Sequence, residues 1–428
     1  MSGTRDACPA SSERPLQIAL TVYRGNPFCG GQGVYVRHLS AALVRLGHRV
    51  TVFSGQPYPD LADGVKLVRI PSLDLYREPN PFRKPRLREI GRAVDLLEVA
   101  TMFSGGFPEP RTFSIRVRDE LRRRRGDFDV VHDDQSLGRA LLDLASDGLA
   151  VVASVHHPVA IDRELELAAA TNRRKRFSLK RWYGFSKMQD RVARALPVLL
   201  TVSQSAKRDI VREMGADAER VAVVPVGVDA SVWRPMPEID RVPGRIMTTA
   251  SADIPLKGLA VLLEALAKLR TECDDAHLVV VGRLRAKSPI VDLIGRLGLD
   301  DAVEFVAGES DEDLVRRYAS SSVAVVPSLY EGFSLPAIEA MACGVALVAS
   351  DGGALPEVVG ESGLGAIVVP AGDAHELMRA IRGLLENPGL AAAIGARARQ
   401  RVAERFTWDE TARGSVAAYR RAIDAVSC

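Results

Sequence analysis

Short apolar runs alternate with amphipathic stretches along the first half of the chain. The run at 16–23 is followed by a glycine-rich turn, a stretch with helical spacing at 34–46 and a second run at 50–53. This order of strand, helix and strand is typical of a right-handed βαβ unit with parallel strands. Further short, nearly continuous apolar runs lie at 130–132, 150–156 and 198–202. Such runs are typical of strands buried on both faces, so the pattern predicts a doubly wound α/β domain.

The second half of the chain shows the same alternation. Strands are predicted at 246–249, 277–281, 303–306, 323–326, 346–349 and 366–369. Helices are predicted between them, for example at 258–270 and 311–320. A segment with proline and glycine at 224–237 separates the two series. We therefore predict a second doubly wound domain, and because ligands of such sheets bind at the carboxyl ends of the strands, we expect a binding cleft between the two domains.

Composition and charge narrow the class of protein. The 428 residues are 47% hydrophobic and 26% charged, with a net charge of +3. These values are ordinary for a folded globular protein and do not by themselves favour nucleic acid as a partner. Residues 1–228 carry 36 basic and 26 acidic side chains, whereas residues 229–428 carry 21 and 28. The first half is therefore basic and the second acidic.

Cysteine usage and the absence of long apolar segments favour a cytoplasmic location. The five cysteines lie far apart and form no C-x-x-C pair, so they suggest neither a disulfide framework nor a zinc site. The first 15 residues are polar and lack the apolar core of a signal peptide. No stretch reaches the roughly 18 apolar residues that a membrane span needs. We expect a cytoplasmic protein.

Two stretches of the first half interrupt the alternation. One combines the basic segment 82–88 with the proline- and glycine-rich segment 103–110. The other, 173–183, carries six positive charges together with Phe177, Trp182 and Tyr183. Either stretch is compatible with an acceptor site or with a solvated surface. The second is also compatible with weak peripheral contact at an anionic membrane, such as the inner membrane face.

Glycines follow the first predicted strand. Gly30, Gly31 and Gly33 lie between that strand and the next helix, where backbone N–H groups can approach an anion. Neither the dinucleotide pattern G-x-G-x-x-G nor the P-loop is present. A plain tight turn is the alternative interpretation.

The most informative segment follows the predicted strand at 323–326. Here Glu331 and Glu339 are separated by seven residues, with Glu331 in a loop and Glu339 in a helix that Pro336 helps to start. Carboxylates at such positions can accept hydrogen bonds from hydroxyl groups. The amides of Phe333, Ser334 and Leu335 lie at the predicted helix N-terminus and can bind a phosphate. A ligand that carries sugar hydroxyls and phosphate is consistent with this arrangement.

This segment resembles the E-G-F-x-L-P-x-x-E-A-M-A-x-G motif of the family 4 retaining glycosyltransferases, also called glycosyl transferases group 1, which have the GT-B fold. The resemblance extends over most of the chain and includes the early glycine turn, Thr201-Val-Ser-Gln-Ser-Ala-Lys207, Pro255-Leu-Lys-Gly258 and Gly353-Ala-Leu-Pro-Glu357. It implies two Rossmann-like domains facing across a cleft. Residues 1–228 would bind the acceptor, 229–407 the nucleotide sugar, and the helix 408–428 would pack back on the first domain.

The resemblance also implies roles for individual residues. Glu331 would hold hydroxyls of the donor sugar, Glu339 the ribose hydroxyls and Lys257 the diphosphate, while His156 would lie near the donor sugar. The turn with Gly30, Gly31 and Gly33 would lie against the phosphate and the acceptor. Expected catalytic residues are thus Glu331, His156 and Lys257.

The chain departs from the family pattern at one position. Many members carry an arginine six residues before the lysine, where this chain has Ser251. A departing diphosphate favours more than one cation. Arg283, which follows the predicted strand at 277–281, is a candidate substitute, although a surface arginine on a loop is the alternative interpretation.

The sequence therefore predicts a retaining hexosyltransferase that uses a nucleotide-diphosphate sugar as substrate and needs no cofactor or metal. Asp133 and Asp134 resemble an acidic metal pair, but a strand-end cap or an acceptor contact agrees better with their isolated position. A nucleotide-sugar epimerase on the same fold and a non-catalytic nucleotide-sugar-binding protein are the alternatives. The base, the sugar, the acceptor and the oligomeric state stay open.

Overall fold

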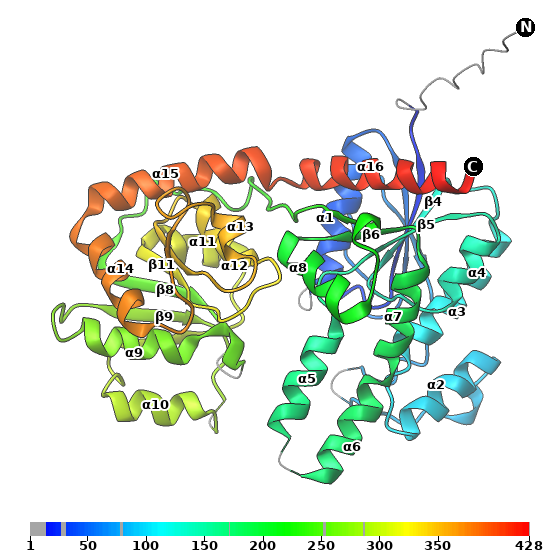
Figure 1. The fold of residues 1–428 in the computed structure, drawn as a ribbon, viewed down its shortest axis with the longest axis horizontal. Helices are drawn as coiled ribbons and strands as arrows, with labels where there is room; N and C mark the ends of the chain where they lie inside the picture. The colour runs from blue at the N-terminus through cyan, green and yellow to red at the C-terminus, as the bar shows by residue number, and fades with distance from the viewer. Residues whose placement is uncertain are drawn as a thin grey trace, which may run out of the picture. The chain divides into compact units, whose positions relative to one another are not determined.

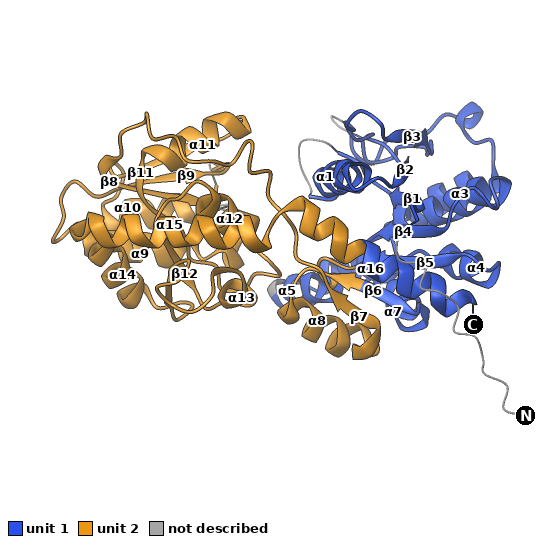
Figure 2. Cartoon of the chain, turned by 90° about the horizontal axis from the view of Figure 1, so that it is seen from above, with its two compact units in different colours: residues 1–154, 159–199, 416–428 blue, residues 155–158, 200–415 orange. Residues whose placement is uncertain are grey.

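The computed structural model describes residues 14–26, 31–77, 80–170, 172–250, 254–285 and 287–427 (Figure 1). The chain divides into two compact units, coloured separately in Figure 2. The first unit comprises residues 1–154, 159–199 and 416–428, and the second comprises 155–158 and 200–415.

The first sheet has seven strands in the order β3-β2-β1-β4-β5-β6-β7. Its strands are β1 (Gln17–Val22), β2 (Arg49–Ser54), β3 (Lys66–Arg69), β4 (Val130–Asp134), β5 (Ala150–Ser154), β6 (Val198–Thr201) and β7 (Val221–Val223). The strand β1 pairs in parallel with both β2 and β4. The order of strands reverses at β1, and crevices at the carboxyl ends of strands beside such a reversal are where ligands of doubly wound sheets bind.

Helices and short turns connect these strands. They are α1 (Gln32–Arg45), α2 (Ala93–Phe103), α3 (Glu109–Arg123), α4 (Ala140–Ser146), α5 (Val159–Ala169), α6 (Arg173–Trp182), α7 (Ser186–Ala195) and α8 (Gln204–Asp209), with η1 (Leu87–Glu89), η2 (Tyr183–Phe185), η3 (Ile210–Met214) and η4 (Ala218–Arg220). The α1 helix is amphipathic, and its buried residues include Val36, Leu39 and Leu43. Their spacing of three and four residues explains why the helix covers the sheet with one face.

The second sheet has six strands in the order β10-β9-β8-β11-β12-β13. They are β8 (Val242–Thr249), β9 (His277–Val281), β10 (Val303–Val306), β11 (Ser321–Val326), β12 (Leu347–Ser350) and β13 (Ile367–Val369). All five neighbouring pairs are parallel. Two parallel sheets with connecting helices confirm the predicted fold class.

The second unit has its own apolar core. Its connecting elements are η5 (Pro255–Lys257), α9 (Leu259–Leu269), α10 (Pro289–Leu297), α11 (Asp311–Ser320), α12 (Leu335–Ala342), α13 (Leu355–Val359), α14 (Ala374–Glu386) and α15 (Pro388–Arg405). Leu262, Leu266 and Leu269 of α9 are fully buried in this core. Side chains of β8, β9, β11, β12 and α14 complete it, so the sheet is covered by helices that bury leucine-rich faces.

The last helix, α16 (Trp408–Ser427), begins in the second unit and ends in the first. In the first unit its Tyr419 is fully buried, and the Tyr419 Oη and His132 Nδ1 atoms lie 2.7 Å apart in a hydrogen bond. The other ring nitrogen of His132 is hydrogen-bonded to Ser154 Oγ at 2.7 Å. This buried chain of polar groups fixes the end of α16 to β4 and β5.

In the part of the chain that the structure describes, no helix has the length and apolar character needed to cross a lipid bilayer.

Candidate functional site

The loop between β11 and α12 holds the first glutamate of the motif. Glu331 is 7% exposed. Lys257 Nζ donates to both of its carboxylate oxygens, at 2.9 and 3.1 Å, and Ser328 Oγ donates to Oε1 at 2.7 Å. Burial of a carboxylate is tolerated because the charge is paired and hydrogen-bonded. The structure thus brings together two of the three predicted catalytic side chains.

Two glycines allow this pairing. Gly258 has a φ of +68°, and a Cβ atom there would lie 1.9 Å from the backbone oxygen of Pro327. Gly353 has a φ of +66°, and a Cβ atom there would lie 2.3 Å from the backbone oxygen of Glu331. Only glycine fits such close approaches with a left-handed backbone. The lysine segment and the glutamate loop therefore pack backbone to backbone, which places Lys257 beside Glu331.

The start of α12 carries the predicted amides. Ser334, which precedes the helix, has a φ of 95°, and its Oγ atom is buried without a hydrogen-bond partner. Phe333 is 8% exposed and its ring lies 5.8 Å from that of Phe406. Leu335 is exposed at the first helical position. The first amides of a helix have no partner within the helix, and an unusual backbone at Ser334 together with an unpaired hydroxyl is typical of a ligand-binding loop.

Glu339 lies one turn into α12 and is half-buried. Burial, with a smaller contribution from the carboxylate of Asp311, raises the pKa of Glu339 to about 8. Its carboxyl group makes no hydrogen bond to any residue that the structure describes. A half-buried carboxyl without a partner is suited to accept hydroxyl groups of a ligand.

A large open pocket lies at the carboxyl ends of β8, β9 and β10. Its volume is about 950 Å³. Lys257 and Arg283 both line it, with Thr249, Phe305 and Pro336 among the other lining residues. Pro336 belongs to the first turn of α12. Arg285 lines the pocket as well, so it combines three cationic side chains with a helix N-terminus, a combination suited to phosphate groups.

His156 follows β5 and is half-buried. Its backbone oxygen lies close to the glutamate loop, because a Cβ atom added to Gly332 would lie 3.4 Å from it. The ring of the neighbouring His157 lies 6.3 Å from that of Tyr330. The predicted histidine thus lies beside the Glu331 loop within the second unit.

The glycine turn is described in part. Gly31 has a φ of +74° and precedes α1, and a Cβ atom on Gly33 would lie 2.1 Å from the backbone oxygen of Asn26. These glycines are required for a tight connection from β1 to α1. Gly30 and Ser251 lie outside the described residues.

Asp133 and Asp134 are fully buried at the end of β4. Asp133 accepts hydrogen bonds from Thr21 Oγ1, from Ser136 Oγ and, at 2.8 Å, from the backbone N–H of Leu137. Asp133 therefore acts as a strand-end cap, one of the two interpretations favoured by the sequence. Among the described residues, no group of three or more side chains of the kinds that bind metals lies together.

The contacts of Glu357 are not predictable from the sequence. Its carboxylate accepts from the backbone N–H groups of Gln204 and Ser205, both at 2.7 Å, at the start of α8. Tyr330 Oη in the glutamate loop donates to Asp209 at the end of the same helix. Glu357 is the last residue of the motif Gly353-Ala-Leu-Pro-Glu357, and this position indicates a functional or structural role. Its hydrogen-bond partners cannot be identified from the sequence, because they lie more than 150 residues away along the chain.

Two doubly wound sheets, the Glu331–Lys257 pair and a second glutamate one turn into α12 define a GT-B glycosyltransferase. The profile described as Glycosyltransferase Family 4 matches residues 29–232, and that described as Glycosyl transferases group 1 matches residues 241–401. The chain belongs to the family 4 glycosyltransferases.

Curated relatives cover nearly the whole chain. A protein of Mycolicibacterium hassiacum named MMP alpha-(1->4)-mannosyltransferase is 51% identical over 413 residues, which are 96% of this chain and 100% of the relative. A protein of Rhodococcus jostii named D-inositol 3-phosphate glycosyltransferase is 28% identical over 451 residues, covering 97% of this chain and 91% of the relative. The first relative is therefore much more similar than the second.

Solved structures share the fold. Sucrose-phosphate synthase from Thermosynechococcus elongatus has a TM-score of 0.69 at 22% identity, covering 95% of this chain and 99% of that one. The Anabaena protein Alr3699/HepE, solved with UDP and glucose, has a TM-score of 0.65 at 18% identity, covering 94% and 98%. At these identities the similarity concerns the fold alone.

Proposed function

We propose that this glycosyltransferase moves mannose from a nucleoside-diphosphate sugar to the 4-hydroxyl of an acceptor sugar, with retention at the anomeric carbon. The observation that carries the proposal is the 51% identity, over the full length of the relative, to a protein named as an alpha-(1->4)-mannosyltransferase. The relatives named D-inositol 3-phosphate glycosyltransferase are only 27–32% identical, which favours mannosyl transfer over glycosyl transfer to inositol 3-phosphate.

The pocket of the second unit supports a sugar diphosphate as donor. Lys257 and Arg283 line it from two different loops, and two cations offset the charge of a diphosphate better than one. Glu331 and Glu339 supply carboxylates for hydroxyl groups of the sugar and the ribose. The Anabaena protein, which has the same fold, has also been solved in complex with UDP-glucose, a sugar diphosphate of this kind.

The ion pair between Lys257 and Glu331 suggests how the site responds to the donor. A lysine ammonium has three N–H donors, so Lys257 can keep one bond to Glu331 and donate the others to the diphosphate. Glu331, still held by Ser328, then accepts from the sugar. Binding therefore redistributes existing hydrogen bonds and leaves no buried charge unpaired.

The chemical step follows from retention and from the charges in the pocket. The bond between the anomeric carbon and the departing phosphate oxygen breaks, and the bond to the acceptor oxygen forms on the same face of the sugar. The acceptor proton passes to the departing phosphate oxygen, so charges and atoms balance. Lys257 and Arg283 stabilise the negative charge on the diphosphate, and this role requires no metal ion.

The test is transfer by the purified protein. GDP-mannose, UDP-glucose and UDP-N-acetylglucosamine are each incubated with methyl α-D-mannopyranoside, and the products are examined by NMR for the new linkage and its anomeric configuration. We expect an α-(1→4)-linked mannoside. Conversion of the donor sugar without acceptor would favour the epimerase, binding without turnover would favour the non-catalytic alternative, and a β-linked product would contradict retention.

A further inference from the structure

A second polar site lies in the first unit, at the carboxyl ends of β1, β2 and β3. A small hollow of about 10 Å³ there is lined by residues that directly follow the three strands: Tyr23, Gly55, Gln56, Ile70 and Ser72. The other lining residues, Glu109, Thr112, Phe113 and Arg116, belong to α3. A hollow of this size accommodates one water-sized group. Carboxyl ends of parallel strands are the ligand-binding edge of such sheets.

Two charged side chains line the hollow with polar atoms that have no hydrogen-bond partner. Glu109 and Arg116 lie seven residues apart on one face of α3 and are 8% and 5% exposed. Glu109 Oε2 and Arg116 Nη1 are buried and make no hydrogen bond. Unsatisfied buried polar atoms of charged groups are costly, so a ligand or a water is needed there.

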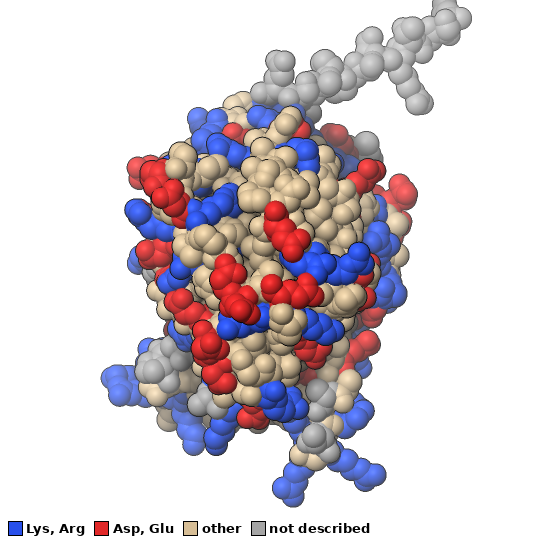
Figure 3. Space-filling view, turned by 90° about the vertical axis from the view of Figure 1, so that its left-hand side faces the viewer, with Lys and Arg blue, Asp and Glu red and all other residues tan. Residues whose placement is uncertain are grey.

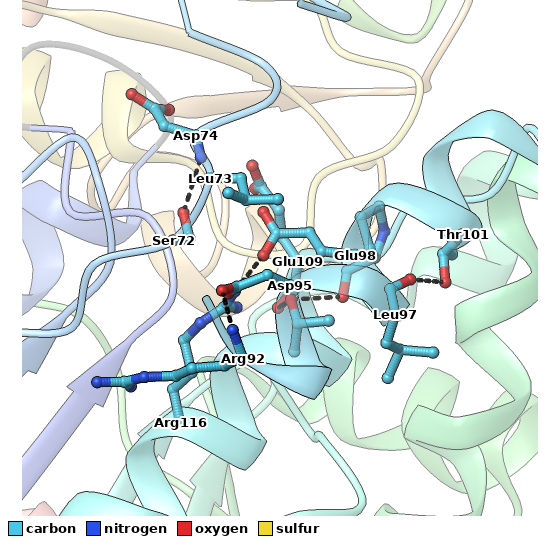
Figure 4. Close-up of polar contacts among 12 residues, drawn as sticks. Ser72, Leu73, Asp74, Arg92, Asp95, Leu97, Glu98, Thr101, Glu109 and Arg116 are labelled. Carbon is cyan, nitrogen blue, oxygen red and sulfur yellow. Dashed lines mark hydrogen bonds and ion pairs between the residues drawn. The ribbon is translucent and has the colours of Figure 1, made fainter. Parts of the chain in front are cut away.

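The other terminal nitrogen of Arg116 forms ion pairs within the protein. Arg116 Nη2 donates to Asp95 Oδ1 at 2.7 Å and to Glu98 Oε2 at 2.5 Å, both on α2. Figure 4 shows the carboxylates of Asp95, Glu98 and Glu109 gathered near Arg116. The nearest cation to Glu109 is Arg24, whose Nε lies 3.5 Å from Oε2. Three carboxyl groups face two guanidinium groups, so the cluster lacks the excess of positive charge that an anionic ligand would need.

The charge of this cluster and the small volume of the hollow limit the kind of ligand that can bind. Burial raises the pKa of Glu109 to about 7 and outweighs the opposite effect of Arg24, while Glu98 and Asp74 raise it further. An anionic group such as phosphate is disfavoured beside the carboxylates and is too large for the hollow. A hydroxyl group fits, because it can donate to Glu109 Oε2 and accept from Arg116 Nη1 at once.

We propose that this hollow is a subsite that binds one hydroxyl group of the sugar acceptor, with Glu109 and Arg116 as specificity-determining residues. The inference rests on the proposed function, since it concerns the acceptor of that reaction. Gln56, which accepts from the backbone N–H of Ser72 at 2.8 Å, holds the opposite wall in position. A hydroxyl group bound here orients the acceptor ring.

The test compares acceptors that lack single hydroxyl groups. KM and kcat are measured with GDP-mannose and methyl α-D-mannopyranoside, and with its 2-, 3- and 6-deoxy analogues. For the wild type we expect one analogue to show a KM raised by about tenfold or more, the loss of a hydrogen bond to a charged group. In Glu109→Gln the KM for the parent acceptor should rise similarly, and the penalty for that analogue should shrink to within about twofold.

The control is Glu120→Gln, the same substitution on the same helix at a residue that pairs with Arg123 and Arg124 and does not line the hollow. It should leave every KM unchanged. An equal deoxy penalty in Glu109→Gln and wild type would mean that the hollow holds only a buried water, and would overturn the inference. If Glu109→Gln does not fold, a wild type indifferent to all three analogues overturns it alone. Absence of transfer to any mannoside would overturn the proposed function as well, and is seen before any variant is compared.

Discussion

At the scale of single residues, the donor pocket uses cations from two loops. Lys257 is held by Glu331, whereas Arg283 is exposed on the loop after β9 and lines the same pocket. Nothing in the spacing of the sequence connects residues 257 and 283. The parallel order β8–β9 brings the loops together, and the rule that ligands bind at strand carboxyl ends is the reason why Arg283 was a candidate in the sequence.

We predict that Arg283→Ala weakens nucleoside-diphosphate binding by about ten- to a hundredfold, the loss of one charge-assisted contact. The nucleoside monophosphate should be less affected. Isothermal titration with GDP and GMP measures both. Arg296→Ala, on the solvent side of α10, is the control. GDP affinity within about twofold of wild type would show that Lys257 and the α12 amides suffice.

Glu331→Gln tests the motif itself. The variant keeps the shape of the side chain but removes the charge that pairs with Lys257. We expect kcat to fall by at least about a hundredfold, the scale of one preorganised contact to the transition state. Steady-state kinetics with saturating donor measure it. Near-normal kcat would contradict a role in turnover.

The raised pKa of Glu339 predicts a pH dependence of donor affinity. In the empty protein the carboxyl group is largely neutral below its pKa of about 8, and ribose hydroxyls bind best to the ionised form. Affinity should therefore rise with pH up to about 8 and level off above it. In Glu339→Gln the affinity should be weaker and independent of pH in this range. Titrations with GDP across this pH range measure the affinity. A wild-type affinity that does not change with pH would exclude the ribose contact.

At the scale of elements, strands dominated by apolar residues were predictable and a half-charged edge strand was not. β9 and β10 were predicted to the residue because branched and aromatic apolar side chains dominate both, although Glu304 lies within β10 and β10 is itself an edge strand. β3 was missed because its four residues, Lys66 to Arg69, are half charged and lie at the sheet edge, where burial is incomplete. β8 begins four residues before the predicted start, because a proline and a glycine interrupt its apolar pattern.

The helix α6 shows why the basic run was ambiguous. None of its residues is buried, and Phe177 is 64% exposed. Its end is nevertheless fixed, since the ring of Trp182 lies 5.7 Å from Tyr76 and 5.1 Å from Phe107. The aromatics at the end of the run belong to the packing of the unit, and Arg181 donates to the backbone oxygen of Ser104. The exposed charges at 173–176 can meet a solvent-borne partner.

We predict that α6 binds anionic surfaces weakly. At low salt, vesicles rich in phosphatidylserine should sediment a fraction of the protein, because each basic side chain near the lipid contributes about 1 kcal/mol. About 0.5 M salt should abolish the effect. Replacing Arg173, Arg174, Lys175 and Arg176 by glutamine should do the same without lowering thermal stability. Failure of the wild type to sediment at low salt would leave a soluble acceptor as the only partner of this helix.

The terminal helix α16 gives a prediction for stability. Tyr419→Phe removes the hydrogen-bond partner of the buried His132, which should lower the free energy of unfolding by about 1–3 kcal/mol. Denaturant unfolding followed by circular dichroism measures it. Tyr58→Phe is the control, because the Tyr58 side chain is only half-buried. An equal change in both variants would contradict the role of the His132 contact.

At the scale of the whole molecule, charge is segregated along the sequence but mixed on the face that Figure 3 shows. Figure 3 shows one face of the molecule, where Lys and Arg side chains alternate with Asp and Glu. On the coloured residues of this face neither sign forms the continuous field that nucleic-acid binding requires. Part of the basic excess of residues 1–228 lies in α6. The net charge of the whole chain does not reveal such a local excess and therefore does not identify a partner.

Activity is predicted to be independent of added metal. Lys257 and Arg283 offset diphosphate charge in the proposed mechanism, and no cluster of metal-binding side chains occurs among the described residues. Transfer should continue in excess EDTA at an unchanged rate. Loss of activity that Mg²⁺ or Mn²⁺ restores would contradict this prediction and would make Asp133 and Asp134 candidate metal ligands.

The backbone contacts at Gly258 and Gly353 have a consequence for engineering. Any side chain at either position would collide with the backbone of Pro327 or Glu331, so the frame that presents Lys257 and Glu331 cannot be varied without losing it. Libraries that aim to change the donor should leave this frame intact and randomise the pocket wall at Thr249, Leu284 and Phe305. A protein built this way can exchange its sugar or base while retaining its catalytic frame, which divides the second unit into an invariant part and a replaceable one.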